Sequence, residues 1–247
     1  AGGTRLSVGC ALGVAAGALQ RLQSLHRLGY VHNDVSPGNL CVGLDVDADG
    51  SGTAEVARQQ IHLIDLGCCT RASTAAAPAV PTCEPVGTLM YASVAAHEGG
   101  VPTRPADDLE SLGYMTAFLM RGDLPWEYER SERAVVRAKK QARTDDSMLF
   151  SGLPDEAAFA MRALLDPALR AGPGDVDHEA VLRSLRFAIA AYTRRQPPSG
   201  DELDVDAPPP LMDWERQGLR WTAAGVILDA DGNVLHSPVA TPCNANE

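Results

Sequence analysis

Three oxygen-bearing side chains stand at a spacing that very few folds use. Asp34 lies within Tyr-Val-His-Asn-Asp-Val-Ser-Pro-Gly-Asn, a stretch that ends at Asn39. Asp65 begins an Asp-Leu-Gly segment directly after the strand-like run 60–64. A carboxylate, an amide five residues later and a second carboxylate at a strand end can together orient a hydroxyl and bind metal-bound phosphate. The spacing therefore predicts a phosphoryl-transfer site at Asp34, Asn39 and Asp65.

The composition narrows the class of protein. The 247 residues are 45% hydrophobic and 21% charged, which suits one substantial core and a small appendage. The formal net charge of -11 argues against a nucleic-acid partner, because binding a phosphate backbone needs clustered Lys and Arg. The six cysteines lack paired metal-ligand spacing, which favours free thiols in a reducing compartment. We therefore expect an intracellular protein, cytoplasmic or nuclear.

The uncharged stretch 6–19 is too short to span a membrane, so we expect no membrane partner. Leu12, Ala15 and Leu19 recur at steps of three and four residues, which places them on one face of a helix. The pattern predicts a buried helix over 5–28 that leads directly into the segment containing Asp34.

The rest of the chain predicts an α+β, predominantly α-helical fold. Two short strands, 40–43 and 60–64, favour a small hairpin at the predicted cleft. The loop 45–52 resembles the opening of a calcium-binding EF-hand, but Val56 stands at the twelfth position and we interpret the loop as a solvated connection. A buried central helix follows Asp107, and further helices are expected at about 127–143, 154–166 and 177–194.

Proline-rich stretches divide the chain into three parts. We predict a folded domain over 1–195, a Pro-rich linker over 196–210 and a short tail over 211–247. In the tail, the apolar runs 226–228 and 234–235 flank Asp-Ala-Asp-Gly-Asn, which favours a β-hairpin.

Four segments, 29–39, 61–67, 87–93 and 107–126, together resemble the large C-terminal lobe of a eukaryotic protein kinase, most closely the casein kinase 1 family. The most specific of these are Gly-Thr-x-x-Tyr-Ala-Ser and the run Asp-Asp-Leu-Glu-Ser-Leu-Gly-Tyr with its later Leu-Pro-Trp. The resemblance implies a C-lobe fold, ATP and Mg²⁺ as cofactors, and protein substrates with serine or threonine acceptors.

The resemblance also implies a role for each site residue. Asp34 would accept or orient the proton of the substrate hydroxyl, and Asn39 and Asp65 would hold magnesium ions that bridge the phosphates. Cys41 matches the position that forms the floor under the adenine ring. Thr88 matches the hydroxyl that steadies the catalytic aspartate.

Further positions are implied to support this site. Asp108 matches a buried aspartate that binds the backbone of the catalytic loop. His32 and Leu66 would pack in a hydrophobic column beneath the active site, with Leu66 replacing a more common phenylalanine.

Three residues depart from the family pattern. Ser36 stands where these kinases carry a lysine that contacts the γ-phosphate, and a hydroxyl cannot replace that positive charge. Asn33 replaces an arginine that pairs with a phosphorylated activation loop, which argues against that mode of control. Met90 replaces an arginine that binds anions near the substrate, which weakens the expectation of acidic substrates.

The elements that cover ATP in the family, a glycine-rich loop and a Val-Ala-x-Lys strand, do not precede Leu6. Because the sequence begins with Ala1, we expect a truncated record of a longer product rather than a natural loss. A serine/threonine kinase is the favoured interpretation. A pseudokinase that serves as an interaction scaffold and a small-molecule phosphotransferase remain alternatives.

Overall fold

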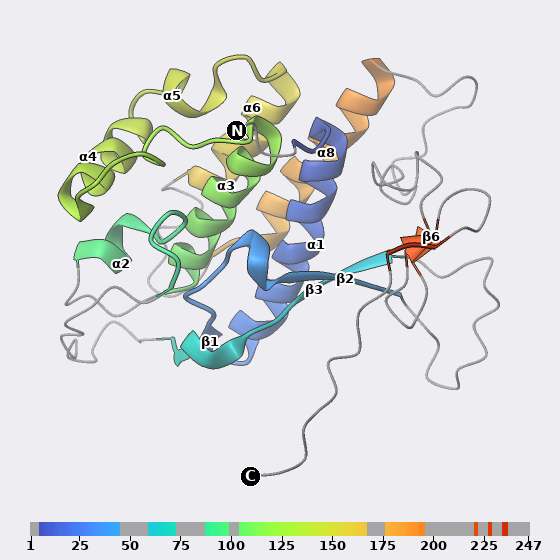
Figure 1. Ribbon diagram of the computed structural model, residues 1–247, viewed down its shortest axis with the longest axis horizontal. Coiled ribbons are helices and arrows are strands. Elements are labelled where there is room, and N and C mark those ends of the chain that lie inside the picture. Colours follow the sequence, from blue (N-terminus) through green and yellow to red (C-terminus); the bar gives the residue numbers. More distant parts are fainter. Residues whose placement is uncertain are drawn as a thin grey trace, which may run out of the picture. The chain divides into compact units, whose positions relative to one another are not determined.

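The computed structural model describes most of the first 195 residues and three short strands of the tail (Figure 1). Its contacts divide the chain into two units, Ala1–Pro210 and Leu211–Glu247. The described residues are 5–44, 59–72, 87–98, 104–166, 176–195, 220–221, 227–228 and 234–236. The EF-hand-like loop, the Pro-rich linker and two cysteines, Cys83 and Cys243, lie outside them.

The elements of the first unit confirm the predicted α+β, mostly helical class with one small hairpin. The helices are α1 Val8–Arg27, α2 Val94–Glu98, α3 Pro105–Arg121, α4 Glu132–Ala142, α5 Ser147–Phe150, α6 Asp155–Leu165 and α8 His178–Arg195. The strands are β1 Tyr30–Val31, β2 Leu40–Leu44, β3 Gln59–Leu63 and β4 Thr70–Arg71, with 3-10 turns η1 Pro37–Asn39 and η2 Leu66–Cys68.

Helix α1 forms where the apolar periodicity predicts it and is three residues shorter at its start. Ser7 caps it, because the Ser7 Oγ accepts a hydrogen bond from the backbone N of Cys10 at 3.2 Å. At the other end Gly29 adopts a φ of 81°, a left-handed conformation that glycine tolerates and that stops the helix. The chain then enters β1 and the segment with Asp34.

The core of this unit is a layer of long helices. Helix α1 packs against α3 and α8, and α6 packs against both α3 and α8 (Figure 1). Leu109, Leu112 and Met115 of α3 are fully buried, as the predicted central helix requires. Gly113 permits the close approach of α6, because a Cβ there would lie 2.7 Å from the Leu165 side chain.

Strands β2 and β3 pair antiparallel, with Cys41 opposite His62, which confirms the predicted hairpin. One end of the hairpin packs on α1, where a Cβ on Gly17 would lie 2.8 Å from the Cβ of Ile61. A second pairing joins β1 to β4, and the predicted site residues Asp34, Asn39 and Asp65 lie between these two strands in the sequence.

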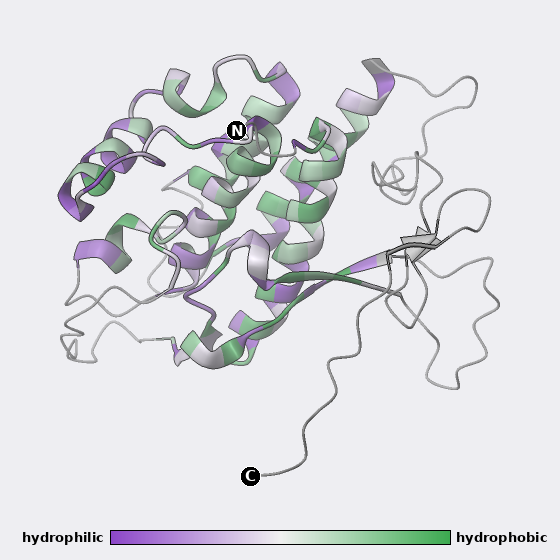
Figure 2. Ribbon diagram, in the orientation of Figure 1, coloured by the Kyte–Doolittle hydropathy of each residue, from purple (hydrophilic) through white to green (hydrophobic). Residues whose placement is uncertain are grey.

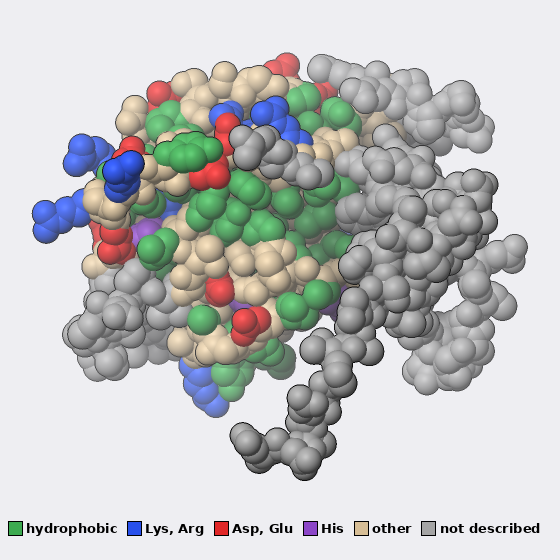
Figure 3. Space-filling model, viewed as in Figure 1, with side chains coloured by type: hydrophobic (Ala, Val, Ile, Leu, Met, Phe, Trp, Pro, Cys, Tyr) green, Lys and Arg blue, Asp and Glu red, His purple; other side chains and the backbone are tan. Residues whose placement is uncertain are grey.

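Helix α4 begins at Glu132, five residues after the predicted start at 127. The intervening residues form turns, in which Glu127 N donates to Leu124 O at 3.0 Å, and Ser131 then caps the helix. Figure 2 shows that α1 is largely hydrophobic whereas α4 carries many hydrophilic positions. On the face drawn in Figure 3, hydrophobic side chains gather over α1 and α3, and basic ones lie at the edge over α4.

The second unit contains a three-stranded antiparallel sheet in the order β5-β6-β7, formed by Arg220–Trp221, Ile227–Leu228 and Val234–His236. Strands β6 and β7 pair antiparallel where the sequence favoured a hairpin, and β5 adds a strand that the sequence did not indicate. Among the helices of the described residues, none has both the length and the apolar composition needed to cross a bilayer.

Candidate active site

The carboxylate of Asp34 is held by three hydrogen bonds. The backbone N and the Oγ1 of Thr88 donate to Asp34 Oδ1 at 2.7 and 2.8 Å, and Asn39 Nδ2 donates to Asp34 Oδ2 at 2.9 Å. Asn39 Nδ2 also donates to the backbone O of Asp34 at 2.8 Å. The structure therefore brings together three of the predicted site residues from two separate segments.

Glycine is required at position 87 for this arrangement. Gly87 has a φ of 89°, and a Cβ there would lie 2.4 Å from Asn33 O and 3.2 Å from Asp34 Oδ1. Only a residue without a side chain lets the backbone of Thr88 approach the aspartate this closely.

Asp65 directly follows a residue that is hydrogen-bonded to Asn39. The backbone N of Ile64 donates to Asn39 O at 2.9 Å, which ties the residue before Asp65 to the end of the catalytic segment. Burial raises the pKa of the Cys68 thiol, and the negative charges of Asp34 and Asp65 also raise it. The bond between Ile64 and Asn39 therefore links the two chain segments that carry the predicted site residues.

The backbone of Asp65 is held in an uncommon conformation. Its φ is 61°, in the left-handed region, and its Oδ1 accepts a hydrogen bond from Gly67 N at 3.2 Å. The residue is exposed, so a carboxylate oxygen is presented to solvent beside the catalytic segment. Strained backbone of this kind persists where the surrounding structure enforces it, often at functional sites.

Asp108 binds the backbone of the residues just before Asp34, the position that the resemblance implied for it. Its Oδ2 accepts from His32 N at 2.8 Å and its Oδ1 accepts from Asn33 N at 2.8 Å, while the residue itself is only 1% exposed. The two backbone amides lie immediately before Asp34. The first turn of α3 therefore fixes the backbone that leads into Asp34.

Two histidines that sequence reasoning did not identify also contact Asp108 or its partner. His26 Nε2 lies 2.7 Å from Asp108 Oδ2, and His26 Nδ1 lies 2.7 Å from His178 Nε2. Burial, together with the neighbouring His26, lowers the pKa of His178 to about 4. A line of hydrogen-bonded side chains thus runs from α8 through α1 to α3.

The position of Asn33 explains how an amide takes the place of the usual arginine. Its Nδ2 donates to Cys68 O at 2.8 Å and to Thr70 Oγ1 at 2.9 Å. The side chain therefore links the catalytic segment to η2 and β4 through neutral hydrogen bonds. Its Oδ1 is buried and has no hydrogen-bond partner among the described residues.

The structure also locates four other predicted positions. Ser36 is 5% exposed and lies at the N-cap of η1 without a side-chain capping bond. Cys41 is exposed on β2, and among the described residues Cys10, Cys41, Cys68 and Cys69 form no disulfide. His32 is fully buried as expected, with Nε2 3.1 Å from Ile64 O, but Leu66 is 58% exposed and the prediction that it packs in a column is wrong here.

The donor set of Asn39 and Asp65 fits magnesium bound to a nucleotide. Because the Asn39 nitrogen faces Asp34, the amide oxygen on the opposite branch is the donor left for a metal. Within the described residues, no group of three or more His, Cys, Asp or Glu side chains is arranged to hold a metal. Magnesium at nucleotide sites typically uses about one or two protein carboxylates together with phosphate oxygens, so the set is sufficient.

Sequence reasoning missed the group that holds the segment after Thr88. Lys139 of α4 is fully buried, and its Nζ donates to Leu89 O at 2.8 Å and to Ala92 O at 2.6 Å. Its Nζ also lies 5.4 Å from the centre of the Trp126 ring. Burial lowers the pKa of Lys139 to about 7.

Glu110 links the segment after Thr88 to α3. Its Oε1 accepts from Val94 N at 3.0 Å and from the Tyr114 hydroxyl at 2.7 Å, and its Oε2 forms an ion pair with Arg143. Glu110 is only 1% exposed, so these partners stabilise a buried charge.

The known proteins to which this chain is similar are protein kinases. Residues 6–120 match the sequence profile of the fungal protein kinase family. A casein kinase 1-like protein of Oryza sativa subsp. japonica is 35% identical over 151 residues, which cover 57% of this chain and 20% of that protein.

Two further relatives agree with this match. A probable serine/threonine-protein kinase of Dictyostelium discoideum is 31% identical over 65% of this chain and 30% of its own length. A putative casein kinase I of Caenorhabditis elegans is 32% identical over 51% of this chain and 35% of its own length. The matches thus span only 20% to 35% of the lengths of these relatives.

Proposed function

We propose that the complete protein transfers the γ-phosphate of ATP to serine or threonine hydroxyls of protein substrates. The proposal is supported by the match of residues 6–120 to the fungal protein kinase profile and by the similarity to casein kinase 1-like proteins. The expected cofactors are ATP and Mg²⁺. The proposal rests chiefly on the way in which Asp34 is held.

The hydrogen bonds to Asp34 leave room for one substrate hydroxyl. An ionised carboxylate has about four acceptor positions on its two oxygens. Among the described residues, Thr88 fills two of these positions and Asn39 fills one. The remaining position on Oδ2 would accept the hydrogen bond of the acceptor hydroxyl, which orients its oxygen and takes up its proton as the phosphate is transferred.

Asn39 and Asp65 would hold Mg²⁺, with Asn39 contributing its amide oxygen and Asp65 the carboxylate oxygen that is not bonded to Gly67. When bound, the metal would neutralise charge on the phosphates. Cys41 would lie under the adenine ring, an assignment that rests on the resemblance.

Ser36 supports a second candidate function. Its hydroxyl lacks the positive charge that these kinases place beside the γ-phosphate, which would reduce the stabilisation of the transferring group. A scaffold with little or no catalytic activity is therefore the alternative, and a measurement of turnover distinguishes the two.

The test is phosphate transfer from radiolabelled ATP, with magnesium, to casein by the complete product of the gene that encodes this chain. Asp34→Asn removes the proton acceptor but keeps the side-chain shape, so turnover should fall by about 10²–10⁴-fold. Thermal melting of both proteins controls for folding. Equal turnover by the two proteins would exclude Asp34 from this role, and absence of transfer by the unaltered protein would favour the scaffold.

A further inference from the structure

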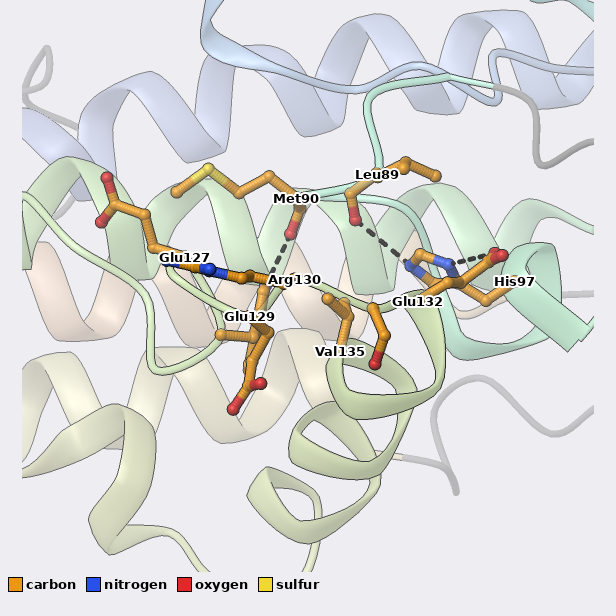
Figure 4. Close-up of a pocket in the computed structure, with 10 residues that line it drawn as sticks. Leu89, Met90, His97, Glu127, Glu129, Arg130, Glu132 and Val135 are labelled. Carbon is orange, nitrogen blue, oxygen red and sulfur yellow. Dashed lines mark hydrogen bonds and ion pairs between the residues drawn. The ribbon is translucent and has the colours of Figure 1, made fainter.

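A small pocket lies beside the candidate active site, on the segment that follows Thr88 (Figure 4). Its apolar surface comes from Leu89 and Met90 on one side, Val135 of α4 on the other, and Trp126, which is 1% exposed and donates through Nε1 to Met90 O at 2.8 Å. Leu89 remains 45% exposed, so the apolar surface reaches the outside of the molecule.

The volume of the pocket limits what can occupy it. It encloses about 200 Å³, whereas sites for small organic ligands usually enclose about 300–1,000 Å³. A single long side chain, projecting from a peptide that lies across the surface, fits this size better than a whole small molecule.

The rim of the pocket is acidic. Glu127, Glu129 and Glu132 line it together with a single guanidinium, that of Arg130. Glu132 is paired with His97, whose Nδ1 lies 3.0 Å from Glu132 Oε1. Glu127 and Glu129 are exposed and form no ion pair with any other described residue.

The one lysine near the pocket does not offset this charge at the rim. Lys139 is fully buried, and its Nζ is engaged by the carbonyls of Leu89 and Ala92 and by His97, at 3.0 Å from Nε2. Its amine therefore supports the backbone behind the pocket instead of facing an incoming ligand.

The pocket is close to the reacting atoms along the chain. Thr88 bonds to Asp34, and the next two residues, Leu89 and Met90, already line the pocket. Because an extended chain advances by about 3.3–3.6 Å per residue, a bound peptide with its hydroxyl at Asp34 would place a residue about two to four positions away in this pocket.

We propose that this pocket selects the protein substrate: it takes an apolar side chain that is flanked by Lys or Arg, within a few residues of the acceptor serine or threonine. This inference rests on the proposed kinase function. The apolar walls supply burial for the first side chain, and the carboxylates of Glu127 and Glu129 attract the neighbouring cation while repelling acidic sequences. The substrate class is therefore basic and apolar, not acidic.

Two fluorescein-labelled serine peptides test the proposal against the complete protein. They are identical except that one carries Leu-Arg three residues from the serine and the other carries Leu-Asp. Fluorescence anisotropy, measured without ATP, should give a dissociation constant about tenfold lower for the Leu-Arg peptide, because opposite rather than like charges then meet at the rim. The specificity ratio kcat/KM should follow the same order, mainly through KM.

Matched variants locate the effect. Glu127→Lys should reduce the preference to near unity, and Met90→Arg should shift it towards the Leu-Asp peptide. Glu179→Lys, the same charge change on α8, should leave the preference intact. Equal dissociation constants for the two peptides, or a preference that Glu127→Lys does not alter, would overturn the proposal. Selective binding without phosphate transfer would instead overturn the proposed kinase function.

Discussion

The Oγ1 of Thr88 donates a hydrogen bond to Asp34 Oδ1 at 2.8 Å, across 54 residues of sequence. The backbone N of Thr88 donates to the same oxygen, so one residue supplies two of the bonds that fix this carboxylate. The hydroxyl bond can be removed by substitution whereas the backbone bond cannot, which makes Thr88 a sensitive probe of the site.

Thr88→Ala should lower turnover by about 10–100-fold, because hydrogen bonds to charged groups contribute about 1.5–3 kcal/mol. Thr88→Ser keeps the hydroxyl and should retain most of the activity. Initial rates of phosphate transfer for the three proteins check this expectation, with melting temperatures as the folding control. A Thr88→Ala protein that matches the unaltered one would show that the hydroxyl does not position Asp34.

Gly87→Ala should impair both stability and activity. It introduces strain at a φ of 89° and drives a Cβ against Asn33 O. Gly29→Ala is the matched control, since its φ is 81° but nothing lies within 4 Å of the added Cβ. We expect Gly29→Ala to cost only the backbone strain of about 1–2 kcal/mol, as measured by urea unfolding, and to preserve turnover.

A larger loss of stability in Gly87→Ala, together with loss of turnover, would separate the steric clash from the backbone strain. Comparable stability and turnover in the two variants would contradict the close approach of Gly87 to the catalytic segment.

Lys139 should make stability depend on pH in the alkaline range. Burial lowers its pKa in the folded protein to about 7, while Glu110 raises it and Arg143 lowers it. Between about pH 7 and 10 the unfolded chain binds a proton that the folded one does not, so stability rises with pH, by up to about 1.4 kcal/mol per pH unit. The free energy of unfolding of the unaltered protein should therefore increase with pH relative to that of Lys139→Met, as urea unfolding at several pH values would show. Parallel curves for the two proteins would contradict a buried, neutral amine.

His178 should cause a loss of stability in acid. Because burial lowers its pKa to about 4, the folded protein keeps the neutral ring while the unfolded chain binds a proton below about pH 6.5. The contribution of His178 to stability is complete above that pH and is lost as the pH falls towards 4. His178→Gln should thus be less sensitive to pH across this interval, measured by thermal melting at fixed ionic strength. An identical acid response in both proteins would rule out His178 as the titrating group.

The local parts of this fold follow from the sequence, because their causes lie within a few residues. The apolar repeat of Leu12, Ala15 and Leu19 predicts α1, and Gly29 marks its end. The paired strands and the central helix could likewise be predicted from the sequence. The turns before Ser131 were not predicted, because an apolar repeat alone does not locate the first residue of a helix.

Some residues of the candidate site could likewise be predicted from the sequence, and others could not. Asp34, Asn39 and Asp65 are separated by characteristic spacings, so their convergence was predicted. Lys139 was missed because a lysine in a charged helix is normally a surface residue, and only the tertiary fold shows that it is fully buried. Leu66 shows the opposite error, since an apolar side chain was assigned to a core and is largely exposed.

The contact between His26 and His178 joins residues 152 positions apart. Since a ribosome adds only about 5–20 residues per second, α1 and the catalytic segment emerge several seconds before α8 is available. During translation the hydrogen bonds between Asp108 and the backbone of His32 and Asn33 can form first. The contact between His26 and His178 is added only when α8 has been synthesised.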